Sequence, residues 1–187
     1  MLLAMNPSTP AVISQELLAL VADLVPGGKP IALSRDAPAE ARPLDCFETI
    51  ERCIVDRGGA ACYGWLLWEC PRLFLEAEFY AAWRDGDGKL HDITPRVGPA
   101  LVLFVPDPVR VFEGRRVPSV RRALTKDPAV AGFLRACDEE FELINRGARA
   151  FARNVALQGQ ELGELQIIWQ RKIAFSQRLA LLETSEA

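Results

Sequence analysis

The strongest constraint on the fold is an alternation of side-chain type along residues 73–83. Hydrophobic side chains occupy every second position, namely Leu73, Leu75, Ala77, Phe79, Ala81 and Trp83. A period of two is typical of a β-strand with one buried face. A strong turn signal, Asp85-Gly86-Asp87-Gly88, follows, so we expect residues 89–94 to return as the partner strand. Apolar runs at 61–68, 100–105 and 109–112 predict further strands.

Segments with helical spacing lie on both sides of these strands. Apolar residues recur every three or four positions over residues 14–24 and 46–57, and a glycine pair follows each stretch. Asp127-Pro128 is a typical helix start, and the apolar stripe after it runs over 130–155. A last helix is predicted over 161–183.

The order of these elements predicts an α+β fold. It has N-terminal helices, a central antiparallel sheet and two long C-terminal helices. Residues 1–43 are expected to form an arm, a short helix and a loop, because four prolines fall within 25–43. Residues 44–117 form the predicted core. Residues 118–187 form a helical extension that packs on the core or on a partner.

Composition excludes several classes of function. The chain has 187 residues and a net charge of −3, so nucleic-acid binding through bulk charge is not expected. No apolar run reaches the ~18 residues of a membrane span, so no membrane partner is expected. Five cysteines without a Cys-x-x-Cys pair argue against a disulfide framework or a zinc site. They indicate reduced thiols in a cytoplasmic protein, and neither a metal nor a cofactor is predicted.

Cys46 opens the predicted helix over residues 46–57. Asp45 is the expected N-cap, and Glu48 lies at capping-box spacing from it. A helix N-terminus stabilises a thiolate and lowers the pKa of a thiol, which is how a cysteine becomes a nucleophile. The carboxylate of Asp45 opposes this effect, and the sequence alone leaves open which of the two dominates.

A series of short motifs runs from Cys46 to Pro95. It consists of Cys46, Gly58-Gly59, Gly64-Trp65, Glu78-Phe79, Trp83 and Asp92-Ile93-Thr94-Pro95. The series spans about a third of the chain and resembles the papain-like and transglutaminase-like superfamily, including a group of uncharacterised bacterial proteins. The resemblance implies a cysteine nucleophile at a helix start. It also implies a histidine on a following strand that takes the thiol proton, and an aspartate that orients the imidazole.

Two positions depart from the family pattern. Tyr80 stands in place of the histidine, and Thr49 in place of an asparagine. A phenol with a pKa near ~10 is a poor base at neutral pH, so Cys46, Tyr80 and Asp92 cannot form a thiolate–imidazolium pair. The single histidine, His91, is next to Asp92 in the expected strand. It therefore points to the opposite face unless a bulge re-aims it.

Two functions follow from these residues. The first is a catalytically degenerate papain-like or transglutaminase-like domain that binds a peptide, an acyl group or a protein partner. The alternative is a cysteine-dependent acyl-transfer enzyme, an amide or thioester hydrolase or transferase. In that enzyme Cys46 would be the nucleophile and Asp92 its support, while Tyr80, His91 or the substrate would handle the proton.

Further side chains are candidates for binding. Trp65, Glu78 and Trp83 are candidate substrate contacts, although sheet packing and solvation are the commoner roles of such residues. The arginines and lysine within 110–126 are candidates for contact with phosphates or an acidic partner, although a solvated connector is the commoner role of such a stretch. The two C-terminal helices offer an assembly surface, because the last helix has apolar residues on more than one side, and a homodimer through them is left open.

Overall fold

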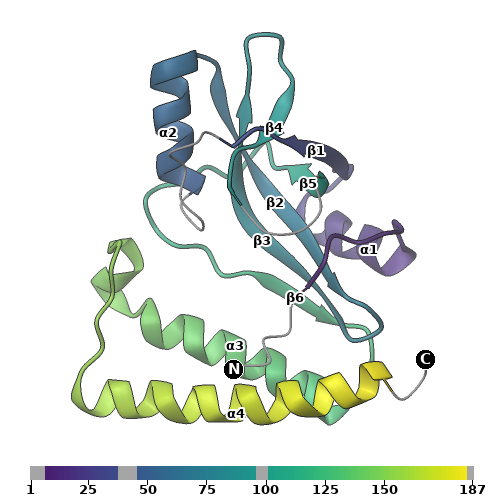
Figure 1. Ribbon diagram of the computed structural model, residues 1–187, viewed down its shortest axis with the longest axis vertical. Helices are drawn as coiled ribbons and strands as arrows, with labels where there is room; N and C mark the ends of the chain where they lie inside the picture. Colours follow the sequence, from purple (N-terminus) through teal and green to yellow (C-terminus); the bar gives the residue numbers. More distant parts are fainter. Residues whose placement is uncertain (1–6, 38–45, 96–100, 185–187) are drawn as a thin grey trace. The chain divides into compact units, whose positions relative to one another are not determined.

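The computed structural model describes residues 7–37, 46–95 and 101–184, and the chain divides into two compact units (Figure 1). The first, which we call the sheet unit, comprises residues 9–68 and 77–112. The second, which we call the helical unit, contains the described residues of 1–8, 69–76 and 113–187.

Five strands pair in a closed ring. The strands are β1 (Ile31–Arg35), β2 (Ala60–Cys70), β3 (Phe74–Arg84), β4 (Leu90–Asp92) and β5 (Leu101–Pro106). Their order is β2-β5-β1-β4-β3, and the ring closes because β2 also pairs with β3. The pairs of β5 with β1 and β2, and of β3 with β4, are antiparallel, whereas β1 runs parallel to β4.

The prediction of a loop over residues 25–43 is wrong for β1. The apolar run at Ile31 is too short to indicate a strand by its period. The strand forms because partners distant in sequence flank it on both sides, with Ile31 opposite Phe104 and Ser34 opposite His91. The predicted strand over 109–112 is also wrong, since these residues follow β5 without regular structure.

Two helices pack in the sheet unit. Helix α1 (Gln15–Leu24) begins where the hydroxyl of Ser14 accepts a hydrogen bond from the backbone N–H of Leu17, as a helix cap does. Helix α2 (Cys46–Arg57) has the predicted bounds, and its buried residues are Cys46, Thr49, Ile50 and Cys53. The predicted N-cap, Asp45, lies outside the described residues.

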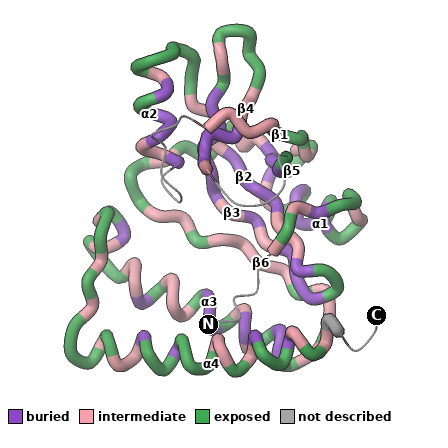
Figure 2. Tube along the Cα trace, in the orientation of Figure 1, coloured by how far each residue is buried: buried purple, intermediate pink, exposed green. Residues whose placement is uncertain are grey.

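The alternation along β3 divides its side chains between two hydrophobic clusters. Tyr80 and Ala82 pack inside the ring with Leu33, Leu66 and Phe104. Ala81 and Trp83 belong to the cluster against α2. Most of β2 and β3 is therefore buried (Figure 2). The prediction that only one face of β3 is buried is therefore wrong. The ring also encloses the face that carries Tyr80.

The helical unit is built on two long antiparallel helices (Figure 1). Its elements are β6 (Val120–Ala123), α3 (Pro128–Ile144), a 3₁₀ turn (Gly147–Phe151) and α4 (Gly159–Thr184). Asp127 caps α3 by accepting a hydrogen bond from the backbone N–H of Ala129 at 2.7 Å. The apolar stripe predicted over 130–155 does not form one helix, since α3 ends at Ile144. The mixed α+β class and the long C-terminal helix are confirmed.

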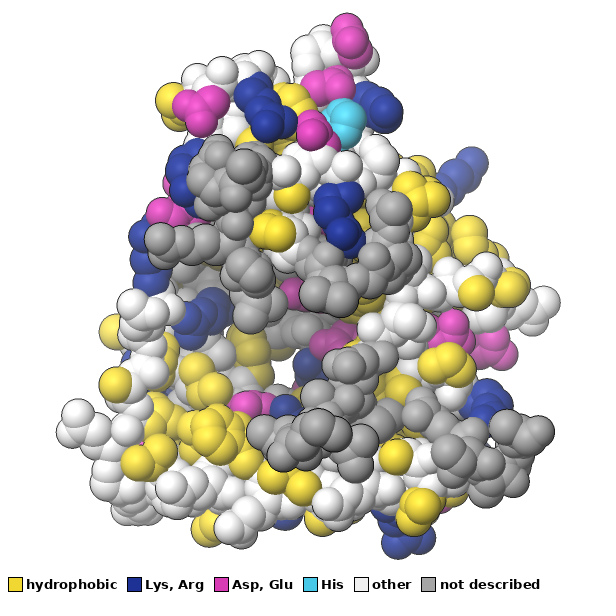
Figure 3. Space-filling model, in the orientation of Figure 1, with side chains coloured by type: hydrophobic (Ala, Val, Ile, Leu, Met, Phe, Trp, Pro, Cys, Tyr) yellow, Lys and Arg dark blue, Asp and Glu magenta, His cyan; other side chains and the backbone are white. Residues whose placement is uncertain are grey.

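Apolar side chains also reach the surface of the helical unit. Figure 3 shows hydrophobic side chains gathered over α3 and α4. Trp169 and Ile167 on α4 expose 45% and 58% of their surface, respectively. The described helices are nevertheless too short or too polar to cross a lipid bilayer.

Candidate functional site

The fold places Cys46 against the strand that carries Tyr80. Cys46 is the first residue of α2, and its side chain is buried in the cluster that holds Tyr80 and Phe104. The backbone N–H of Ala81, the next residue on β3, lies within hydrogen-bonding reach of the sulfur. The N-terminal end of α2 and strand β3, both predicted from the sequence, therefore meet at the sulfur of Cys46.

Burial determines the ionisation of Cys46. Removal from water raises the pKa of the thiol from 9.0 to about 12, since the interior disfavours the charged form. The backbone N–H of Ala81 favours the thiolate and lowers the pKa, whereas the carboxylate of Glu78 raises it. Burial thus outweighs the stabilising effect of a helix N-terminus on a thiolate, and the thiol stays protonated at neutral pH.

Tyr80, Asp92 and Thr94 form a buried hydrogen-bonded group. The phenol of Tyr80 donates to Asp92 Oδ1 at 2.5 Å and lies 2.7 Å from the hydroxyl of Thr94. The backbone N–H of Thr94 donates to the same carboxylate oxygen. Burial raises the pKa of Tyr80 well above its usual value, and the charge of Asp92 raises it further. Tyr80 therefore holds its proton and cannot act as a base toward Cys46.

Thr49 lies one turn after Cys46, on the same buried face of α2. The residue is 2% exposed, and its hydroxyl makes no hydrogen bond with any of the residues described. A buried unsatisfied hydroxyl costs about 1–3 kcal/mol. A threonine here consequently adds no hydrogen bond to the Cys46 site.

His91 lies away from this group. Its Nε2 is 2.7 Å from Asp85 Oδ2, and its ring contacts Trp83 with centroids 5.4 Å apart. The hydrogen bond with His91 is the main cause of a lowered pKa for Asp85. Neighbouring strand residues point to opposite faces, which separates His91 from the buried carboxylate of Asp92. His91 thus stabilises the turn between β3 and β4 and supplies no imidazole to Cys46.

The three candidate substrate contacts are engaged within the protein. Trp65 and Trp83 are 2% and 7% exposed, and their indole N–H groups donate to Asp107 and to the carbonyl of Gly58. Glu78 lies on the Cys46 side of β3 and accepts a hydrogen bond from Trp68 Nε1 at 3.0 Å. The tryptophans pack in the core, and of these candidates Glu78 acts on Cys46.

The basic stretch within residues 110–126 is less solvated than the sequence predicts. Arg121, 16% exposed in its side chain, forms ion pairs with Glu76 at 2.7 Å and Asp138 at 3.0 Å. Arg116 donates to Asn145 Oδ1 and to two backbone carbonyls. The interpretation of a solvated connector is thus wrong for these two arginines, which pair with residues of the helical unit to which they themselves belong.

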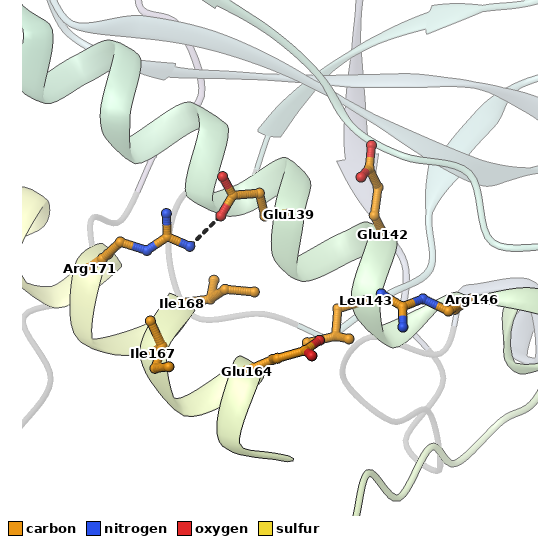
Figure 4. A pocket seen from close by; sticks show the side chains of 8 residues that line it. All are labelled: Glu139, Glu142, Leu143, Arg146, Glu164, Ile167, Ile168 and Arg171. Atoms are coloured by element: carbon orange, nitrogen blue, oxygen red, sulfur yellow. Dashed lines mark hydrogen bonds and ion pairs between the residues drawn. The ribbon is translucent and has the colours of Figure 1, made fainter. Parts of the chain in front are cut away.

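A surface pocket of about 310 Å³ lies in the helical unit (Figure 4). Its lining residues are Glu139, Glu142, Leu143, Arg146, Glu164, Ile167, Ile168 and Arg171. Arg171 pairs with Glu139 across it (Figure 4). The lining mixes both signs of charge with aliphatic side chains and contains no nucleophile.

Metal and disulfide chemistry find no support in the described part of the chain. No three His, Cys, Asp or Glu side chains gather there as metal ligands would. All five cysteines are free and buried. Comparisons of the sequence with protein-family models, with curated proteins and with solved structures found no match.

Proposed function

We propose that this protein is a catalytically degenerate papain-like or transglutaminase-like domain that serves as a binding or assembly module. One observation carries the proposal: a protonated thiol, a phenol and a carboxylate meet where the resembled enzymes have a thiolate–imidazolium pair. Its partner is a peptide, an acyl group or another protein. The free cysteines support a cytoplasmic location.

The ionisation of the site supports the loss of catalysis. Thiolate is the nucleophile in cysteine enzymes, and a thiol pKa of about 12 leaves about one molecule in 10⁵ ionised at pH 7. The nearby phenol holds its own proton through Asp92. No described residue therefore takes the proton from Cys46.

Turnover assays test the proposal. Wild type and Cys46→Ala are incubated with small amide, ester and thioester substrates and with an acceptor amine. We expect the same rate from both proteins, at the level of the uncatalysed reaction. Turnover by wild type that disappears in Cys46→Ala would overturn the proposal and establish the acyl-transfer enzyme instead.

Restoring the imidazole provides a second test. Tyr80→His places a base on β3 beside Cys46 and Asp92, whereas Tyr80→Phe only removes the hydroxyl. We expect Tyr80→His to raise the rate of Cys46 alkylation at pH 7 at least about tenfold over Tyr80→Phe, because an imidazolium favours the thiolate. Equal rates in the two variants would show that the missing histidine does not account for the inert thiol.

A further inference from the structure

Residues 107–112, which we call the strap, leave β5 and cross a face of the sheet unit without regular structure. Asp107 fixes the start of the strap. Its backbone N–H donates to the carbonyl of Tyr63 at 2.9 Å, and its carboxylate accepts hydrogen bonds from Trp65 Nε1 and the backbone N–H of Arg110. The strap then passes the N-terminal end of α2 (Figure 1).

The strap lies on a set of aromatic rings that we call the aromatic platform. The platform consists of Phe47, Tyr63, Trp65 and Phe79. Phe79 lies at its centre, with its ring centroid 5.4 to 6.2 Å from those of the other three residues. Tyr63 and Trp65 are two residues apart on β2, which places them on one face of the strand.

Two side chains of the strap bind this platform. The guanidinium of Arg110 lies 5.3 Å from the ring centroid of Trp65 and 5.9 Å from that of Phe79. The ring of Phe112 stacks on Phe47 with centroids 3.8 Å apart and planes within 9°. Cation–π and stacked aromatic contacts of this kind are specific in geometry.

The remainder of the strap is open to solvent. Val109 is 88% exposed and Val111 is 57% exposed. Apart from the hydrogen bond between Asp107 and Tyr63, the strap makes no backbone pairing with a described strand, so Arg110 and Phe112 supply the contacts that oppose its local opening. Arg110 and Phe112 are two positions apart and turn to the platform, while the intervening Val111 turns to water, as in an extended peptide laid on a surface.

We propose that the aromatic platform is a peptide-binding surface and that the strap occupies it as an internal ligand. The external partner is an extended peptide with an arginine followed two positions later by an aromatic residue. Such a peptide offers the platform the same cation–π and stacking contacts once the strap has opened. This inference rests on the proposed function, because it names the ligand class of the binding module.

A labelled peptide with the sequence of residues 107–113, Asp-Pro-Val-Arg-Val-Phe-Glu, is the probe. Fluorescence anisotropy measures its binding to the full-length chain. We expect Arg110→Ala/Phe112→Ala to bind it at least about tenfold more tightly than wild type, because the internal competitor loses both anchoring contacts. Val109→Ala/Val111→Ala changes exposed side chains of the same strap and is expected to bind like wild type.

Equal affinity of the double variant and wild type would overturn the inference. A second control peptide carries alanine in place of both the arginine and the phenylalanine. If it binds as tightly as the unsubstituted peptide, the inference is overturned as well. If circular dichroism shows that the double variant is unfolded, Arg110→Ala is used instead. We expect this variant to bind the peptide about threefold more tightly than wild type. An unchanged affinity would refute the inference. Cys46-dependent turnover would refute the proposed function, whereas a failure of peptide binding alone refutes only the role of the platform.

Discussion

Removing the hydroxyl of Tyr80 is expected to destabilise the sheet unit strongly. In Tyr80→Phe the carboxylate of Asp92, 1% exposed, loses the donor that lies 2.5 Å away, and the hydroxyl of Thr94 loses a neighbour at 2.7 Å. Hydrogen bonds to charged groups contribute about 1.5–3 kcal/mol, and an unsatisfied buried group costs about 1–3 kcal/mol. Because the backbone N–H of Thr94 still binds Asp92, we expect a loss of about 2–4 kcal/mol.

Tyr63→Phe is the matched control for this substitution. Tyr63 also packs in the sheet unit through its ring, but its hydroxyl makes no hydrogen bond with any residue the structure describes. Its removal is expected to change the free energy of unfolding by less than about 0.5 kcal/mol.

Urea unfolding followed by tryptophan fluorescence measures both variants, because Trp65 and Trp83 report on the sheet unit. A difference between Tyr80→Phe and Tyr63→Phe below about 0.5 kcal/mol would refute the buried hydrogen-bonded group as a source of stability.

Two further predictions concern the thiol and the helix pair. Folding raises the pKa of Cys46 from 9.0 to about 12, so its contribution to stability is complete below pH 9 and is lost as the pH rises from 9 to 12. Between pH 9 and 10 wild type should therefore lose about 1 kcal/mol more of its free energy of unfolding than Cys46→Ala, and an equal loss in urea unfolding would contradict the raised pKa. A Cβ at Gly132 would lie 2.4 Å from the ring of Phe175, so Gly132→Ala should cost about 1–3 kcal/mol. Gly163→Ala, with nothing within 4 Å, should stabilise α4 by about 0.5–1 kcal/mol, and thermal unfolding that ranks these two variants in the opposite order would refute the close packing.

Local signals in the sequence were sufficient to predict the helices that position the candidate site. The bounds of α2 follow from its apolar spacing and from the left-handed Gly58 and Gly59 after it, whose φ values are 74° and 85°. Strand β3 follows from its period of two. By contrast, β1 depends on partners distant in the chain, which a local pattern does not reveal.

The chemistry of the site was less accessible to prediction than its position. The sequence places Cys46 at a helix start, where opposing charges act, but the dominant effect is burial against β3, which depends on tertiary packing. The hydrogen bond between Tyr80 and Asp92 required the pairing of β3 with β4. Nothing local in the sequence indicates that Phe112 stacks on Phe47.

The most direct measurement is the alkylation rate of each cysteine in the folded wild-type protein at pH 7, with iodoacetamide as reagent and peptide mass spectrometry as readout. We expect Cys46 to react as slowly as Cys53 and Cys70, because its thiol is protonated and buried. Reaction of Cys46 at least about tenfold faster than the other four cysteines would reveal an activated thiolate. That result would contradict the assignment of this protein as a catalytically degenerate binding module.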